Sequence, residues 1–218
     1  MPKETKSYIP ALNFHWLTRF YDPVVRWTTR ENTFKEALMR QANLQNGQKI
    51  LDLGCGTGTL GRKIKKQFPA AQVFALDADE KILQMARRKA DRENVEITFE
   101  QGFSDNLPFA DAAFERVVST LFFHHLDNRS MRQTLLETLR VLKPKGELHI
   151  ADFGAPSNVL ERLFSHSSPS TDSAETTADN PEEPLPFLMS ETGFVNVESG
   201  AYFKTIAGTI RLFKALKN

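Results

Sequence analysis

The 218-residue chain has room for one well-buried α/β domain, and its content of 40% hydrophobic and 25% charged residues excludes a fully disordered or fibrous protein. Its formal net charge of +1 provides no strong field for binding nucleic acid or an anionic membrane. A single cysteine, Cys55, excludes an internal disulfide, and no apolar run approaches a membrane span. We therefore expect one cytoplasmic domain over residues 1–218, as a monomer or homodimer.

Residues 8–45 are predicted to form a helical N-terminal cap. Apolar side chains recur four positions apart on both sides of a break at Tyr21-Asp22-Pro23, where proline disfavours helix in the residue before it. The segment is rich in aromatic side chains. These rings either cover a pocket or pack on the domain.

From residue 49 onward, short apolar strands alternate with amphipathic helices, which is the pattern of a mostly parallel sheet. The expected strands are 49–53, 72–77, 95–99, 114–120 and 147–153. The expected buried helix faces are Leu60, Ile64 and Phe68, then Ile82, Ala86 and Ala90, then Met131, Leu135, Leu139 and Leu142. Asp79 and Ser130 are predicted to cap the second and third helices, and residues 143–146 to end the third.

Residues 165–184 contain no Val, Ile, Leu, Met, Phe, Trp or Tyr, so they bury little surface and are predicted to form a polar lid or loop. A short helix around 185–192 is expected to end on Gly193. Residues 195–203 and 209–216 suit a terminal pair of strands.

The most informative stretch runs from Ile50 to Gly61, where a buried strand leads through a glycine-rich turn into a helix. Glycines at 54, 56 and 58 allow a tight turn and a close approach of the backbone to a ligand. The segment Gly56-Thr-Gly-Thr-Leu-Gly61 also satisfies the dinucleotide pattern G-x-G-x-x-G. Asp77 follows Gly58 by nineteen residues, near the spacing of a ribose-binding acid.

The charge and position of the loop distinguish a dinucleotide from a sulfonium cofactor. A dinucleotide site places its first glycine directly after the strand, whereas this match begins three residues after Leu53. Asp52 stands two residues before Gly54, and its carboxylate would repel a pyrophosphate but suits a cofactor that bears a sulfonium and an α-ammonium group. The loop is therefore interpreted as the binding site of a methyl-donating sulfonium cofactor.

Four motifs in chain order resemble the class I S-adenosylmethionine-dependent methyltransferases. They are residues 52–58 (DLGCGTG), 76–79 (LDAD) with 82–86 (ILQMA), 102–109 (GFSDNLPF) with 111–115 (DAAFE), and 139–146 (LRVLKPKG). They lie between residues 50 and 153, about half of the chain, and within the class they are similar to the small-molecule branch that includes quinone-biosynthesis C-methyltransferases.

The resemblance implies an α/β Rossmann-like fold: a seven-stranded, mostly parallel sheet with the last strand antiparallel, helices on both faces and a helical N-terminal cap. It also implies S-adenosylmethionine as cofactor, S-adenosylhomocysteine as its product, and a small-molecule methyl acceptor. The implied cofactor-binding residues are Tyr21, Asp52, Gly54, Cys55, Gly56, Thr57, Gly58, Asp77, Ala78, Phe103, Ser104 and Thr120.

Each part of the cofactor has an expected partner in this set. The loop 54–58 would cradle the methionine part, with Thr120 near it, and Asp77 would accept hydrogen bonds from both ribose hydroxyls. Phe103 stands where the family often has an acid that bonds the adenine amino group, so ring contact or the neighbouring Asp105 would replace that bond. Tyr21 would close over the sulfonium by cation–π attraction, or simply pack on the domain.

His124 and His125 are the candidate catalytic residues. They follow strand 114–120, at the carboxyl edge where open α/β sheets bind ligands. A histidine there is able to act as a base near neutral pH, although in-line methyl transfer needs a base only if the acceptor must lose a proton. The alternative is that the pair only packs the strand end.

Other residues carry weaker signals. Cys55 is small enough for close approach in the glycine loop and is not expected to be a nucleophile. No cluster of His, Cys, Asp and Glu has metal-ligand spacing, so no metal is expected. In the lid, Thr177, Asp179 and Asn180 are candidates to face the substrate.

Two alternatives to a small-molecule methyltransferase stay open. A nucleic-acid methyltransferase is disfavoured by the near-neutral charge and by the missing Asn/Asp-Pro-Pro-Tyr and Pro-Cys signatures. A non-catalytic S-adenosylmethionine-binding subunit is the other. The sequence leaves open the acceptor and whether O, N, C or S is methylated.

Overall fold

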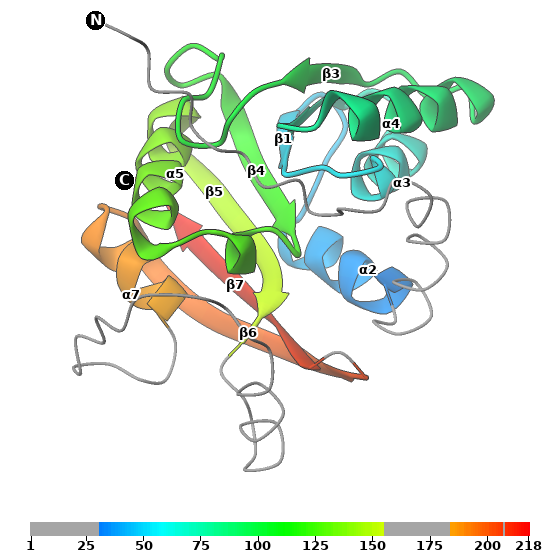
Figure 1. The fold of residues 1–218 in the computed structure, drawn as a ribbon. Coiled ribbons are helices and arrows are strands. Elements are labelled where there is room, and N and C mark those ends of the chain that lie inside the picture. The colour runs from blue at the N-terminus through cyan, green and yellow to red at the C-terminus, as the bar shows by residue number, and fades with distance from the viewer. Residues whose placement is uncertain (1–30, 155–183, 207) are drawn as a thin grey trace, which may run out of the picture.

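The computed structural model describes residues 31–154, 184–206 and 208–218, which form a seven-stranded sheet flanked by helices (Figure 1). The strands are β1 (Lys49–Leu53), β2 (Gln72–Asp77), β3 (Thr98–Gln101), β4 (Phe114–Thr120), β5 (Leu142–Phe153), β6 (Val195–Thr205) and β7 (Gly208–Leu216). The helices are α2 (Glu31–Gln41), α3 (Thr59–Gln67), α4 (Glu80–Arg92), the short 3-10 helix η1 (Phe123–His125), α5 (Asn128–Val141) and α7 (Pro184–Glu191).

The strand order is β3-β2-β1-β4-β5-β7-β6. The pairs β1–β2, β2–β3, β1–β4 and β4–β5 are parallel, and β7 is antiparallel to both β5 and β6. The expected seven-stranded sheet with an antiparallel last strand is therefore confirmed. The chain moves outward from β1 to β3 and then returns to the other side of β1, so the order reverses between β1 and β4. Open α/β sheets bind ligands at the carboxyl ends of the strands beside such a reversal.

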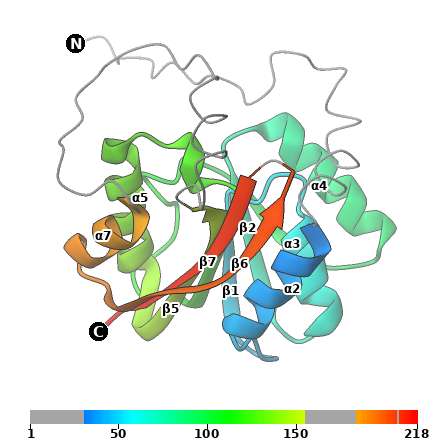
Figure 2. The ribbon, with the colours of Figure 1, turned by 90° about the horizontal axis from the view of Figure 1, so that it is seen from below.

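Helices cover both faces of the sheet, as expected. Helices α5 and α7 lie on one side, the α5 face, and α2, α3 and α4 lie on the other, the α3 face (Figure 2). Side chains of β1 alternate between them: Leu51 and Leu53 join the hydrophobic core on the α5 face, and Ile50 joins the core on the α3 face. Asp52 follows this alternation, so its carboxylate is buried on the α3 face.

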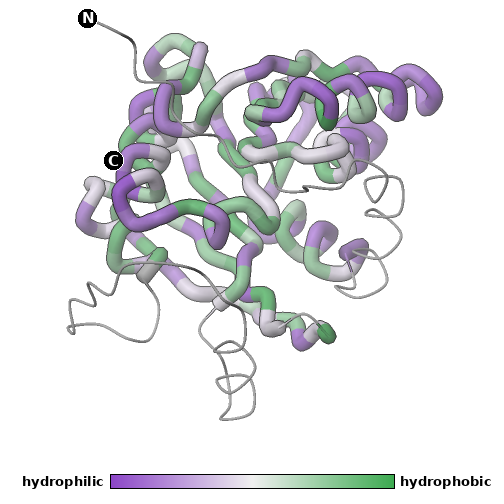
Figure 3. Tube along the Cα trace, in the orientation of Figure 1, coloured by the Kyte–Doolittle hydropathy of each residue, from purple (hydrophilic) through white to green (hydrophobic). Residues whose placement is uncertain are grey.

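Hydropathy follows the same layers. In Figure 3 the strands inside the domain are mostly hydrophobic, whereas the outer helix α4 is mostly hydrophilic. Within the described ranges, none of the helices has the length and apolar character that a membrane span requires.

Four local expectations from the sequence are wrong. Strand β3 begins at Thr98, not at residue 95, because Val95 N–H donates to Ala90 O and extends the end of α4. Asp127, not Ser130, caps α5, since its carboxylate accepts from the Ser130 N–H at 2.7 Å. Leu83 replaces Ile82 in the buried face of α4. Strand β5 begins at Leu142, not at residue 147, so Leu142 belongs to the strand and α5 ends at Val141, just before residues 143–146.

Part of the N-terminal expectation lies outside the described residues. Helix α2 falls within the expected helical cap, and its Phe34 and Leu38 are buried against the α3 face. Tyr21, the rest of the cap before residue 31, and the lid up to residue 183 lie outside the described ranges. Pro184, expected to end the lid, begins α7.

Candidate active site

The glycine loop between β1 and α3 has one packed side and one open side. Gly54 and Gly56 both have positive φ, 69° and 52°, a conformation that residues with a Cβ rarely adopt. A Cβ on Gly54 would lie 2.4 Å from Cγ of Phe122, whereas a Cβ on Gly56 would meet no atom within 4 Å. The loop therefore packs against the residue before η1 at Gly54 and leaves room for a ligand at Gly56.

Asp77, at the end of β2, joins its own strand to this loop. Its Oδ2 accepts a hydrogen bond from the Gly56 N–H at 2.8 Å, and its Oδ1 accepts one from the Asp79 N–H at 3.0 Å. Burial raises the pKa of Asp77, while these backbone N–H groups lower it. A carboxylate oxygen accepts more than one hydrogen bond, so both oxygens retain capacity for the two hydroxyls of a ribose.

Asp52 contributes a buried carboxylate with one unpaired oxygen. Its side chain is fully buried; Oδ2 accepts from the Gly61 N–H at 3.0 Å, and no described residue bonds to Oδ1. Burial raises its pKa to about 6, against the lowering effects of Lys35 and the Gly61 N–H. Lys35 is itself paired with Glu31 at 2.5 Å. A buried unpaired carboxylate oxygen is unfavourable alone and is stabilised by a cation. This pattern fits a ligand that carries an ammonium group.

The remaining loop residues are buried or bonded locally. Burial raises the pKa of the Cys55 thiol well above its usual range, so the thiol stays protonated, in keeping with the expectation that it is no nucleophile. Thr57 is buried, with its hydroxyl 3.5 Å from that of Thr59. Ala78 directs its carbonyl to the Gln101 side chain at 3.1 Å.

The loop after β3 carries the residues expected beside adenine. Phe103 is 49% exposed, so its ring is accessible at the surface. The Ser104 hydroxyl lies 2.7 Å from the Thr134 hydroxyl of α5, so it is already engaged in a hydrogen bond. Ser104 thus ties this loop to α5, a contact that its place in the sequence did not predict.

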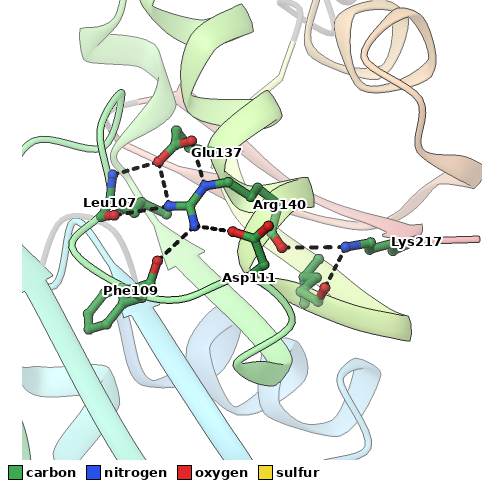
Figure 4. A network of polar contacts seen from close by, with 7 residues as sticks. Leu107, Phe109, Asp111, Glu137, Arg140 and Lys217 are labelled. Carbon is green, nitrogen blue, oxygen red and sulfur yellow. Dashed lines mark hydrogen bonds and ion pairs between the residues drawn. The ribbon is translucent and has the colours of Figure 1, made fainter.

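Arg140 of α5 fixes the next part of the same loop (Figure 4). Its guanidinium donates to the carbonyls of Leu107 at 3.0 Å and Phe109 at 2.8 Å, and it pairs with Asp111 at 2.7 Å. Glu137 bonds both the guanidinium and the Leu107 N–H, each at 2.8 Å. Four of these bonds join the loop to α5 and hold the loop that carries Phe103 in one position relative to the helix.

The turn η1 brings the two candidate histidines to the carboxyl end of β4. His124 Nδ1 lies 2.6 Å from Oδ1 of Asp152, a residue that is 1% exposed at the end of β5. The rings of His124 and His125 lie in contact, with centroids 3.9 Å apart and planes tilted by 43°. Sequence reasoning missed Asp152, although an acid at the carboxyl end of a buried parallel strand is a signal that points to such a site.

Other predicted residues are placed as follows. Thr120 ends β4 opposite Ala151 of β5, at the same edge as η1. His149 is fully buried within β5, where it lies 2.8 Å from Glu147, and burial lowers its pKa. The parts of the chain that the structure describes contain no group of three or more His, Cys, Asp or Glu able to hold a metal ion. Thr177, Asp179 and Asn180 lie outside them.

Comparisons with known proteins agree with this geometry. Residues 50–146 match the family described as a methyltransferase domain. A demethylmenaquinone methyltransferase of Lactobacillus johnsonii is 33% identical over 61% of this chain and 55% of its own length. A ubiquinone/menaquinone biosynthesis C-methyltransferase UbiE of Salmonella paratyphi B is 26% identical over 99% of this chain and 93% of its own length.

Solved structures share the fold. The phosphoethanolamine N-methyltransferase 2 of Haemonchus contortus, in complex with S-adenosyl-L-methionine, matches with a TM-score of 0.65 at 18% identity, over 85% of this chain and 52% of that one. The alignments span 46–55% of the length of four demethylmenaquinone methyltransferases, about half of each.

The strand order, the glycine loop and the match of residues 50–146 to a methyltransferase domain are similar to those of the class I S-adenosylmethionine-dependent methyltransferases, so the resemblance seen in the sequence is confirmed. Within that class, the chain is similar to UbiE and to the demethylmenaquinone methyltransferases.

Proposed function

We propose that this protein transfers a methyl group from S-adenosylmethionine to a small-molecule acceptor, leaving S-adenosylhomocysteine. The observations that carry the proposal are the backbone at Gly56, which is open to a ligand and bonded to the Asp77 carboxylate, and the unpaired buried oxygen of Asp52 on the strand before it. When bound, the cofactor supplies a methyl group activated by its positive sulfonium. The protein's own residues bind and orient the two reactants.

The binding roles follow from the groups present. The backbone of residues 54–58 would hold the methionine part, and the unpaired Asp52 oxygen suits its ammonium. Asp77, beside Ala78, would accept the ribose hydroxyls. The exposed Phe103 ring suits adenine, while Ser104 fixes the loop through Thr134. Cys55, Thr57 and Gly58 would shape the loop, and Thr120 would border the methionine end.

We propose an acceptor of the quinone class in its reduced state. The names of the relatives, demethylmenaquinone and ubiquinone/menaquinone methyltransferases, support the quinone class. A sulfonium methyl group is electrophilic and an oxidised quinone ring is electron-poor, so the two do not react with each other. The hydroquinone is electron-rich and carries hydroxyl groups, which makes it the reactive form.

The other sequence-based expectations also become proposals here. Residues 1–218 would form one domain acting in the cytoplasm as a monomer or homodimer. The net charge of +1 supports a small acceptor over nucleic acid. His124 and His125 are the proposed catalytic residues, and two histidines at the ligand-binding edge support an enzyme over a non-catalytic cofactor-binding subunit.

A methyl-transfer assay tests this function. The protein would be incubated anaerobically with methyl-labelled S-adenosylmethionine and 1,4-naphthohydroquinone, with 1,4-naphthoquinone, duplex DNA and transfer RNA as parallel acceptors. We expect label in the hydroquinone alone. Label in nucleic acid alone would support the nucleic-acid enzyme, and cofactor binding without transfer to any acceptor would support the non-catalytic subunit.

A further inference from the structure

The buried carboxylate of Asp152 makes five polar contacts. Its Oδ2 accepts from the N–H groups of Phe122 at 3.0 Å, Phe123 at 2.7 Å and His124 at 3.4 Å. Its Oδ1 accepts from the Phe153 N–H at 2.8 Å and lies 2.6 Å from His124 Nδ1. A buried charge is tolerated when it is paired in this way. The same carboxylate therefore holds both the backbone of η1 and the ring of His124.

The contact at Nδ1 fixes the tautomer of His124. An ionised carboxylate only accepts hydrogen bonds, so Nδ1 must carry the hydrogen that it donates to Asp152. In the neutral ring, Nε2 then has a free electron pair and is the atom that takes up a proton. The part of the chain that the structure describes provides no hydrogen bond to this nitrogen.

The turn that carries His124 is fixed beside the glycine loop. Phe122, the residue before η1, packs its ring where a Cβ of Gly54 would lie. Leu121 has φ 52°, a strained value for a leucine, and its N–H is held by Ala151 O at 2.9 Å. Such strain persists where surrounding structure enforces it and is concentrated at functional sites. The position of the His124 ring is thus fixed relative to the glycine loop.

His125 has a different environment. Burial lowers its pKa most, a positive charge on His124 lowers it further, and Asp152 raises it. No described residue makes a hydrogen bond to its ring. The charged groups that act on the His125 ring are His124 and Asp152. Arg211 lies opposite Asp152 in the β5–β7 register. Only His124 combines a fixed tautomer with a carboxylate that stabilises its protonated form.

We propose that Asp152 and His124 form a dyad in which Asp152 positions the ring and His124 Nε2 removes a proton from a hydroxyl group of the acceptor. This rests on the proposed methyl transfer and restricts the acceptor to hydroxyl-bearing molecules, such as a hydroquinone or a phenol. The acceptor O–H bond breaks, its electron pair stays on oxygen, and the proton forms the new N–H bond at Nε2. The imidazolium, stabilised by Asp152, later releases that proton to water.

The test compares Asp152→Asn with the wild-type protein, and with Asp127→Asn as a matched control. Asparagine keeps one side-chain oxygen for the Phe122 and Phe123 N–H groups, so η1 is expected to stay in place. The amide nitrogen of the asparagine then faces His124 Nδ1 and favours the opposite tautomer of the ring. Asp127 caps α5 without contacting His124, and asparagine is an equally good cap.

Nitrogen-15 NMR of the histidine rings, without cofactor or acceptor, gives the first readout. In the wild-type protein and in Asp127→Asn at pH 8, we expect His124 to carry its proton on Nδ1, and in Asp152→Asn on Nε2. Turnover of 1,4-naphthohydroquinone is expected to fall by about 10²–10⁴-fold in Asp152→Asn, with S-adenosylhomocysteine affinity unchanged.

A proton on Nε2 in the wild-type protein, or unchanged turnover in Asp152→Asn, would overturn the dyad. Absence of methyl transfer by the wild-type protein would instead contradict the proposed function. In that case the tautomer still decides whether Asp152 positions His124, because the NMR measurement uses the protein alone.

Discussion

Asp52 is a buried carboxylate whose hydrogen bonding is incomplete in the free protein. Its carboxylate is fully buried on the α3 face, and one oxygen has no partner among the described residues. Burial raises its pKa from 3.8 to about 6. Residues with strongly shifted pKa values and incomplete hydrogen bonding are typical of binding sites, where the ligand supplies the missing contact. The unpaired oxygen lowers the stability of the free protein, and a cationic ligand that supplied the missing contact would gain affinity from it.

The first prediction concerns pH and stability. Since the folded-state pKa of Asp52 lies above its unfolded value, the folded protein binds more protons between pH 4 and 6, and the contribution of Asp52 to stability decreases as pH rises through this window. A shift of about two units corresponds to about 3 kcal/mol at pH 7. The stability of Asp52→Asn relative to wild type should therefore rise by up to about 3 kcal/mol between pH 4 and 7.

Urea unfolding at both pH values measures this difference. The exposed Asp91 on α4 provides a control, and Asp91→Asn is measured at both values for comparison. A pH-independent difference between Asp52→Asn and wild type would refute the account of this residue.

At the residue scale, sequence reasoning located groups within a motif and missed partners distant in the chain. Asp52, Asp77 and the glycines are recognisable because their spacing along one strand–turn–helix unit is fixed. Asp152 meets His124 only after β4 and β5 align, and no local pattern encodes that meeting. The Ser104–Thr134 bond is of the same kind.

At the element scale, two glycines of the same loop have different surroundings. Gly54 faces the packed Phe122 ring, and Gly56 faces open space while its N–H holds Asp77. Both have positive φ, so an added Cβ strains the backbone at each by about 1–2 kcal/mol. Only at Gly54 does a steric clash add to that strain.

The second prediction follows from this contrast. Gly54→Ala should destabilise the protein by about 2–5 kcal/mol, the sum of strain and overpacking. Gly56→Ala should lower stability by only about 1–2 kcal/mol. It should weaken S-adenosylhomocysteine binding by at least about tenfold, because the added methyl group occupies space that the ligand is expected to fill. Urea unfolding and calorimetry on both variants measure the two effects. Wild-type affinity in folded Gly56→Ala would argue against the loop as the binding site.

Helices and strands were predicted well where apolar residues recur with a clear helical or strand period. The five parallel strands and the three main helices have strong apolar patterns, and all were found. Errors occurred at boundaries, where a single hydrogen bond decides the outcome: Val95 joins the end of α4, and Asp127 caps α5 in place of Ser130. Periodicity does not distinguish between neighbouring candidates for a cap.

At the scale of the whole molecule, the sheet order brings segments from across the chain to one edge. The ends of β1, β2, β4 and β5 supply Asp52, Asp77, Thr120 and Asp152, and the loop after β3 supplies Phe103. The strand order follows from the resemblance to a known family more than from local patterns, since order depends on contacts between distant strands. The residues gathered at this edge are therefore predictable once the resemblance to the family is recognised.

The central claim is that this edge binds an S-adenosyl cofactor through Asp77, and calorimetry with S-adenosylhomocysteine and NAD tests it most directly. We expect wild-type protein to bind S-adenosylhomocysteine and not NAD. Asp77→Ala should weaken that binding by about one to two decades for each charge-assisted hydrogen bond lost, at ~1.5–3 kcal/mol per bond. The exposed-site variant Asp91→Asn should bind as wild type does. Binding of NAD without S-adenosylhomocysteine, or an unchanged dissociation constant in folded Asp77→Ala, would contradict the account.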